Sequence, residues 1–183
     1  MKFMVISDIH GSTYFLNIAL EVFKKEQADN LIILGDFLNH APRNALPKEY
    51  GPMNVVDLLN NVKDKVIAIK GNCDSEIDEL LLKFPFMPMA MLISGDKKFI
   101  FTHGHIYNED NLPAMNKGDY LIHGHFHIPW VKNVDGRIVA SPGSIAIPRG
   151  NSTYSYMIIE DGTIDIKELL TEKSILEEVK VGE

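Results

Sequence analysis

The segment FMVISDIHGSTYFLNIALEVFKKE, residues 3–26, begins with a short apolar run that is typical of a buried β-strand. The run stops at Ser7, and the polar stretch DIHG follows. Apolar side chains then recur at helical spacing, with Ser12 in position to be the N-cap of a helix. These apolar side chains are Phe15, Ile18, Ala19, Val22 and Phe23. The segment therefore predicts a strand, a polar turn and an amphipathic helix in succession.

Two further apolar runs continue this pattern along the first half of the chain. LIIL (31–34) and VIAI (66–69) are predicted strands that end at GD and at KGNCD. Between them lie a long loop rich in Pro, Gly and Asn (39–52) and a predicted helix, VVDLLNNV (55–62). Short buried strands that alternate with helices indicate parallel pairing through right-handed crossovers.

The second half is mostly strand-like, with tight turns such as Gly95-Asp96 and Asp135-Gly136. A short helix is expected only around residues 111–117. A chain that begins with strand–helix alternation and continues as strands predicts two sheets packed face to face, with helices outside. The sequence contains no internal repeat or linker, so we expect one α/β domain over residues 1–183.

Composition limits the classes of function. The formal net charge is −7 and no run of Lys or Arg exceeds two residues, which argues against a long nucleic-acid footprint. The apolar run at the N-terminus is too short for a signal peptide or a membrane span. Cys73 is the only cysteine, so no disulfide can form within the chain. We therefore expect a cytoplasmic protein that binds neither nucleic acid nor membrane.

Polar clusters follow the apolar strands, and they hold aspartates, histidines and one asparagine. The clusters read DIHG (8–11), GD (35–36), GNCD (71–74), THGH (102–105) and GHFH (124–127). Side chains at strand ends converge on one edge of an α/β protein. Oxygen and nitrogen donors of these kinds suit Mn²⁺, Fe²⁺ or Zn²⁺, and there are more of them than one tetrahedral zinc needs. The set indicates two metal ions that share a carboxylate.

The order and spacing of these clusters resemble the calcineurin-like metallophosphoesterase superfamily. The segments SDIHGS, ILGDFLNHAPRNALP, KGNCDSE, FTHGH, GHFHIP and SPGSIAIPRG also resemble the small bacterial YfcE-type phosphodiesterases. The similarity extends from residue 1 to about residue 160. It implies a four-layer α-β-β-α sandwich, in which helices flank two mixed sheets.

The resemblance also implies the ligands of a dinuclear site. The implied ligands are Asp8, His10 and His127 for the first metal, and Asn72, His103 and His125 for the second. Asp36 would bridge the two metals. His123 precedes the motif glycine, and we interpret it as a strand residue. The expected cofactor is a pair of divalent ions, with Mn²⁺ preferred and Zn²⁺, Fe²⁺ or Ni²⁺ as alternatives.

Four further residues are candidates for catalysis or substrate binding. Many members of the superfamily have histidine at the position of Cys73; a thiol is a poorer general acid, and packing as a small hydrophobe is its alternative role. Asp74 is expected to orient the ligands. Arg43 can meet a substrate phosphate through its guanidinium, or can remain solvated in its loop. His105 is expected beside the ligands, near the substrate, rather than among them.

The expected activity is hydrolysis of small phosphodiesters by a hydroxide that the two metals activate. One alternative is a phosphomonoesterase. Another is a protein-interaction scaffold like the retromer subunit Vps29, which shares the implied fold. The presence of all seven implied ligands favours an enzyme over a scaffold. The expected partner is a small phosphate ester, and the sequence leaves a homo-oligomer open.

Overall fold

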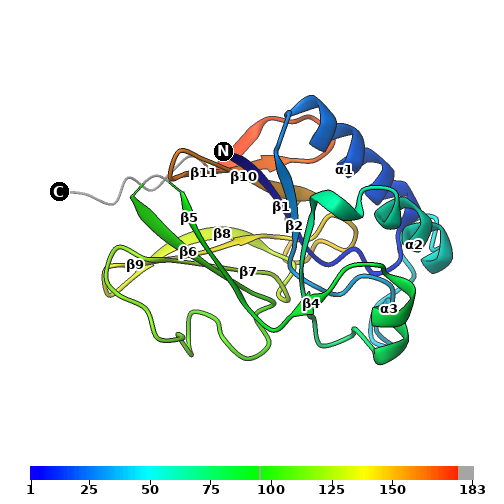
Figure 1. The fold of residues 1–183 in the computed structure, drawn as a ribbon, viewed down its shortest axis with the longest axis horizontal. Helices are drawn as coiled ribbons and strands as arrows, with labels where there is room; N and C mark the ends of the chain where they lie inside the picture. The colour runs from blue at the N-terminus through cyan, green and yellow to red at the C-terminus, as the bar shows by residue number, and fades with distance from the viewer. Residues whose placement is uncertain (95, 177–183) are drawn as a thin grey trace.

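The computed structural model describes residues 1–94 and 96–176 and arranges them as two β-sheets that face each other (Figure 1). From edge to edge, the seven-stranded sheet has β12 (Ser174–Leu176), β11 (Thr163–Glu168), β10 (Ser155–Glu160), β1 (Lys2–Ile6), β2 (Asn30–Ile33), β3 (Val66–Ile69) and β4 (Phe86–Met87). The five-stranded sheet has β5 (Ala90–Ser94), β6 (Lys97–Thr102), β7 (Tyr120–His123), β9 (Arg137–Pro142) and β8 (Pro129–Val134). The helices are α1 (Thr13–Lys25), α2 (Pro52–Asn60) and α3 (Glu76–Leu81), and a 3₁₀ turn covers Lys63–Lys65.

Both sheets are mixed, which confirms the expected fold class. Strands β1 to β4 pair in parallel, and β10 joins β1 in the antiparallel direction. In the other sheet β6, β7 and β9 are parallel, and β5 and β8 pair antiparallel at the two edges. The parallel strands bring several carboxyl ends to one edge of each sheet, where ligand sites of α/β proteins form.

The space between the sheets is filled by apolar side chains. Residues two apart on a strand share a face, so alternate residues of β1 and β2 point inward. The buried members of this core include Phe3, Val5, Ile32, Leu34, Phe99, Phe101, Tyr120 and Ile122. The rigid pair of sheets fixes the positions of the loops that leave it.

Helices α1 and α2 cover the outer face of the seven-stranded sheet (Figure 1). Met4 and Ile6 of β1 belong to the same buried cluster as Leu16 of α1 and Val55 of α2. Ser12 is the N-cap of α1, as predicted, because its Oγ accepts the backbone N–H of Phe15 at 3.4 Å. The cap ends the loop that leaves β1 and so positions the residues between them.

The prediction of a short helix around residues 111–117 is wrong. These residues form turns and bends, and Asn108 and Asn111 exchange backbone hydrogen bonds in a tight turn. Pro113 lacks an N–H and disfavours helical backbone in the residue before it, which explains the absence of a helix there. Met115 of this loop packs with Leu121 on the outer face of the five-stranded sheet. A loop therefore takes the place of a helix on that face.

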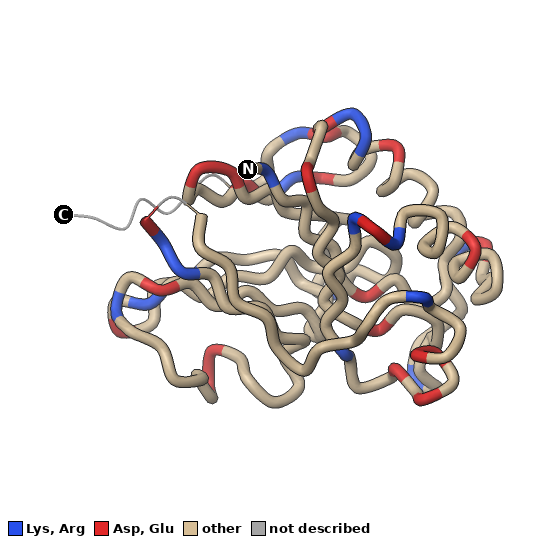
Figure 2. Tube along the Cα trace, in the orientation of Figure 1, with Lys and Arg blue, Asp and Glu red and all other residues tan. Residues whose placement is uncertain are grey.

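Charged residues lie mainly around the periphery of the molecule (Figure 2). Lys and Arg occur in short separate stretches among Asp and Glu, over the described residues. Among the helices of the described part, none is long and apolar enough to span a membrane.

Candidate metal centre

The predicted metal ligands lie just beyond the carboxyl ends of strands from both sheets. Asp8, His10, Asp36 and Asn72 follow strands of the seven-stranded sheet, and His103, His125 and His127 follow strands of the five-stranded sheet. Their side chains come together although Asp8 and His127 lie far apart in the sequence. The convergence of strand ends, expected from the sequence, is thus what brings them together.

The backbone is left-handed at many of these residues. The angle φ is 56° at Asp8, 48° at His10, 58° at Asp36, 70° at His125 and 62° at His127. Residues other than glycine adopt this conformation rarely, and such strain clusters at functional sites. The left-handed turns interrupt the alternation of a strand and direct neighbouring polar side chains toward one point.

Two glycines allow the backbone to approach the ligands closely. A Cβ atom on Gly71 would lie 2.2 Å from Asp36 Oδ1, and one on Gly124 would lie 1.9 Å from Ser7 Oγ. Any larger residue at either position would push a ligand-bearing loop away. This close approach explains why glycine stands beside the polar clusters.

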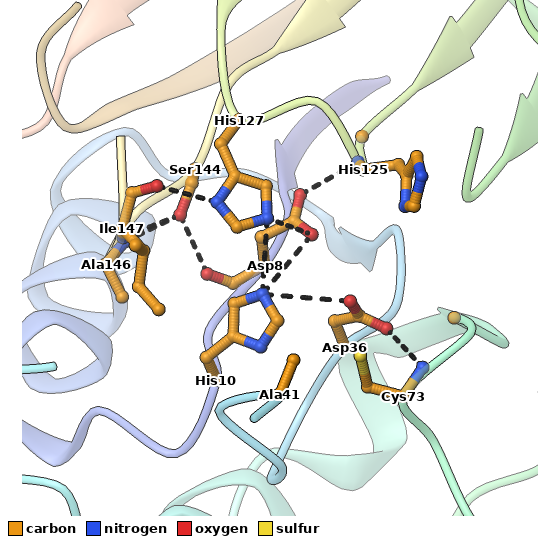
Figure 3. A network of polar contacts seen from close by, with 12 residues as sticks. Asp8, His10, Asp36, Ala41, Cys73, His125, His127, Ser144, Ala146 and Ile147 are labelled. Carbon is orange, nitrogen blue, oxygen red and sulfur yellow. Dashed lines mark hydrogen bonds and ion pairs between the residues drawn. The ribbon is translucent and has the colours of Figure 1, made fainter. Parts of the chain in front are cut away.

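The first group of predicted ligands consists of Asp8, His10 and His127, all buried (Figure 3). His127 Nε2 lies 3.2 Å from Asp8 Oδ1 and 3.3 Å from His10 Nε2. His10 Nε2 lies 3.7 Å from the same Asp8 oxygen. Three donor atoms thus surround one small volume.

The second group consists of Asn72, His103 and His125. His103 Nε2 lies 2.9 Å from Asn72 Oδ1 and 3.2 Å from His125 Nδ1. Asp36 stands between the two groups, because its Oδ2 lies 3.7 Å from His10 Nε2 and 3.5 Å from His103 Nε2. The structure therefore brings all seven predicted ligands together around one shared carboxylate.

Backbone carbonyls fix the orientation of three of the imidazoles. The Nδ1 atoms of His10, His103 and His127 each lie 2.6 Å from a carbonyl oxygen, of Asn39, Leu34 and Ile147 respectively. A carbonyl only accepts, so each Nδ1 donates its proton, and Nε2 is the ring nitrogen that can offer a lone pair to a cation. This is the arrangement by which metal-binding histidines are usually held.

The donor set fits a bound cation. The Nε2 lone pairs of His10 and His127 face each other and Asp8 Oδ1, and this carboxylate oxygen is buried without a hydrogen-bond partner. Buried polar atoms are normally paired, and converging lone pairs repel one another. A divalent ion among these donors would satisfy all of them at once.

Burial and neighbouring charges set the protonation of the ligands. Burial raises the pKa of Asp8, but the adjacent imidazole of His127 outweighs burial and holds the pKa well below its usual range. Burial lowers the pKa of His10, and burial together with the charge of His103 lowers the pKa of His125 to about 4. Burial lowers the pKa of His127, but the adjacent Asp8 carboxylate outweighs burial and raises it. The carboxylate and neutral imidazoles are the forms that bind metals.

Asp74 supports the site from behind. Its carboxylate accepts backbone N–H groups from Asp36 at 2.9 Å, Phe37 at 2.8 Å and Gly71 at 2.6 Å. Burial raises the pKa of Asp74 to about 6, and these donors act in the opposite direction. The side chain ties the loop after β2 to the loop after β3, and it does not point into the site.

Cys73 lies half-buried between the two groups. Its backbone N–H donates to Asp36 Oδ1 at 2.9 Å, and its Sγ accepts from Asn72 Nδ2 at 3.2 Å. Burial and the Asp36 carboxylate raise the pKa of the thiol to about 12. The thiol is therefore protonated at neutral pH and is a weak acid.

Two arginines border the open side of the site. Arg43 and Arg149 both line a hollow of about 210 Å³ that also reaches His10, Asp36 and Cys73. Arg43 was a sequence-based candidate, whereas Arg149 was not. The sequence feature that could have indicated Arg149 is its place near the end of the motif SPGSIAIPRG, residues 141–150.

Two other histidines lie beside the site without entering it. His105 is exposed, with its ring centroid 5.3 Å from that of His103, and lines a separate apolar hollow. His123 ends β7, as predicted, and its Nε2 lies 3.3 Å from Glu109 Oε2, away from the ligands. The trio of alternate histidines thus divides, and only His125 and His127 belong to the centre.

A family model described as a calcineurin-like phosphoesterase superfamily domain matches residues 1–163. This chain belongs to that superfamily. The chain is 42% identical to a curated relative, phosphodiesterase YfcE of Escherichia coli K12, over all of the chain and 99% of the relative. The solved structure of the E. coli phosphoesterase YfcE matches with a TM-score of 0.95 and covers both chains fully.

The superfamily fold is also shared with a protein of another kind. Vps29 of Entamoeba histolytica matches with a TM-score of 0.62 at 21% identity, over 98% of each chain. At this identity the likeness shows the calcineurin-like fold alone. Membership of the superfamily therefore rests on the family model and on the likeness to YfcE.

Proposed function

We propose that this chain is a dinuclear metal-dependent phosphodiesterase that hydrolyses small phosphodiesters. One observation carries the proposal: Asp36 Oδ2 lies between His10 Nε2 and His103 Nε2, at 3.7 and 3.5 Å. A carboxylate between two clusters of donors is suited to join two cations. The buried, unpartnered oxygen of Asp8 supports the same conclusion.

In this proposal each ligand group holds one divalent cation. The first group, Asp8, His10 and His127, and the second, Asn72, His103 and His125, share Asp36. Two such cations, when bound, supply the charge that polarises a phosphoryl group and lowers the pKa of a bound water. Oxygen donors from two aspartates and an asparagine favour Mn²⁺ as the resident ion.

The remaining residues position the site and the substrate. Arg43 and Arg149 bind phosphate oxygens at the open side, because guanidinium groups match phosphate in geometry and charge. Asp74 is a positioning residue that holds the backbone of Asp36. Cys73 contacts the leaving group without an efficient proton transfer, since its thiol is a weak acid. His105 shapes the border near His103.

A diester fits the site better than a monoester. The relative that is 42% identical over the whole chain is a phosphodiesterase, and the hollow over the site shares Phe126 with a neighbouring groove that can hold a second substituent. The full donor set also favours an enzyme over a scaffold. A chain with a single cysteine and no disulfide is suited to the cytoplasm.

Metal reconstitution tests this function. Metal-free protein would be loaded with Mn²⁺, Zn²⁺, Fe²⁺, Ni²⁺ or Mg²⁺ and assayed on matched mono- and diesters with one leaving group. We expect Mn²⁺ to raise the diester rate by about 100-fold or more, because the cations supply several kcal/mol of transition-state stabilisation. A metal-free rate equal to the loaded rate, or faster hydrolysis of monoesters, would contradict the proposal.

A further inference from the structure

Phe126 lies between the candidate ligands His125 and His127, and Ile128 follows them. Both apolar side chains are partly exposed beside the site. Phe126 and Ile128 are each 37% exposed, whereas His127 between them is 2% exposed. Neighbouring side chains of this segment therefore differ in their environment. The histidines face the metal centre, and the apolar residues face solvent beside it.

These exposed side chains border an apolar groove. The groove has a volume of about 500 Å³ and is lined by Glu109, Asp110, Phe126, Ile128, Trp130 and Lys132. Phe126 lines both this groove and the hollow over the metal ligands. A substituent on a phosphate bound at the metal centre therefore needs to pass only one side chain to enter the groove.

The aromatic walls of the groove are held by the buried His123. Its ring lies edge-on to Phe126, with centroids 5.8 Å apart, and to Trp130, with centroids 5.3 Å apart. Phe126 also packs edge-on against the ligand His125, with centroids 5.1 Å apart. These contacts order two aromatic side chains and link one of them to the metal centre.

The charged residues of the groove largely neutralise one another. Lys132 Nζ lies 3.4 Å from Glu109 Oε1 and 4.3 Å from the centroid of the Trp130 ring. Glu109 Oε2 in turn faces His123 Nε2 at 3.3 Å. Asp110 adds a further carboxylate to the lining, so the groove offers aromatic and apolar surface and no surplus of positive charge to attract a second phosphate.

We infer that this groove binds an aromatic ring carried by the phosphodiester substrate. The inference rests on the proposed function and names its substrate class: phosphodiesters with a planar aromatic substituent. The ring packs against Phe126 and Trp130 while the phosphate lies over the ligands. Ordered aromatic side chains favour a flat ring over a flexible alkyl chain, because stacked or edge-on rings gain energy beyond buried area.

Binding can be measured without turnover, because Trp130 is the only tryptophan of the chain. Zn²⁺-loaded protein would be titrated with phenylphosphonate and with methylphosphonate, which share one headgroup. We expect phenylphosphonate to change the Trp130 fluorescence and to bind about 2- to 10-fold more tightly. Phe126→Leu keeps the tryptophan and should remove most of this difference. Ile93→Ala, at an exposed apolar residue on β5 outside the groove, is the control.

Kinetics provide the second measurement. Two methyl phosphodiesters would carry leaving groups of matched acidity, one aryl and one fluoroalkyl. We expect the wild-type kcat/KM to favour the aryl ester by about 2- to 10-fold, and Phe126→Leu to bring the ratio close to one. Matched acidity removes the effect of leaving-group charge, so the ratio reports recognition of the ring.

The outcomes separate the groove from the proposed function. If no ester is hydrolysed but phenylphosphonate still changes the Trp130 signal, the groove stands and the proposed function fails. Equal binding of both phosphonates and equal use of both esters by an active enzyme would overturn the groove assignment. Dissociation of an oligomer by Phe126→Leu, with no phosphonate effect on Trp130, would also overturn it and assign the groove to a second copy of the chain.

Discussion

At the scale of single residues, the site accepts conformational strain to place its donors. Left-handed backbone costs a residue other than glycine about 1–3 kcal/mol, and five of the seven candidate ligands adopt it. Surrounding contacts hold these turns in place; Ser144 Oγ donates to the Asp8 carbonyl at 2.9 Å and accepts from Ala146 and Ile147 (Figure 3). The donors are thus fixed before any cation binds.

Asp36 is the residue whose change should affect both metals. Asp36→Asn removes the charge and replaces one carboxylate oxygen by an amide nitrogen, which cannot accept. We expect loss of metal from both sites and a fall in kcat of about 100-fold or more. Elemental analysis of purified protein would count the metals, with Asp57→Asn on the exposed face of α2 as the charge-matched control. Two tightly bound metals in Asp36→Asn would show that this carboxylate does not bridge.

Cys73 should make the rate sensitive to the leaving group. Its thiol is a weak acid, so poor leaving groups depart without a proton, and alkyl esters should react slower than aryl esters by about 10²–10⁴-fold. Cys73→His should narrow the gap, and Cys73→Ser should change it little. The measurement is kcat/KM for diesters graded by leaving-group pKa. A shallow dependence in the wild type would mean that another residue supplies the proton.

The residue types at the site could be predicted from the sequence, but their supports could not. The polar clusters after the apolar strands indicated the donor types, and the resemblance to the superfamily implied which seven residues are the candidate ligands. The left-handed turns at Asp8 and Asp36, and the carbonyl contact of His127, depend on packing between distant segments. Arg149 was missed because a lone exposed arginine has no periodic signal.

At the scale of elements, the loops after β2 and β3 depend on one carboxylate. Asp74→Asn would replace an acceptor oxygen by an amide nitrogen and leave at least one of three backbone N–H groups without a partner. We expect a loss of about 1–3 kcal/mol in the free energy of unfolding. Urea unfolding of the metal-free protein at pH 8 measures it without a contribution from lost metal. An unchanged midpoint, equal to that of Asp57→Asn, would contradict this role.

The long strands and α1 were predictable because their apolar residues recur with a clear period, and Ser12 marks the start of α1. Short elements were harder. The six-residue α3 and the two-residue β4 carry too few residues for a period to appear. The false helix at 111–117 arose from a loop whose apolar residues pack on the five-stranded sheet without helical backbone.

At the scale of the whole molecule, a half-buried carboxylate at the C-cap of α1 joins this helix to the seven-stranded sheet. Glu26 Oε2 lies 2.9 Å from Lys2 Nζ on β1, and Glu26 Oε1 accepts from Lys167 on β11 at 2.5 Å and from Tyr156 on β10 at 3.0 Å. Burial raises the pKa of Glu26, but these three donors outweigh it and bring the pKa to about 2. The network stabilises the ionised form in the folded state.

This network should make the protein sensitive to acid. A folded-state pKa of about 2, below the usual 4.5, gives stability that is complete above pH 4.5 and is lost as the pH falls toward 2. Glu26→Gln should therefore lower the free energy of unfolding by about 1–2 kcal/mol at pH 6, and by clearly less at pH 3. Denaturant unfolding at both pH values measures this, with the exposed Glu21→Gln as control. An equal difference at both pH values would contradict the assignment.

The position of β1 has a consequence for how the protein is made. The strand lies between β2 and β10, so Lys2 pairs with Glu160, which is synthesised 158 residues later. The metal donors come from both sheets, and the last of them is His127. We expect a nascent chain to remain without metal until nearly all of it has emerged. Only chains that include both sheets would then bind metal, and a truncated chain would bind it weakly.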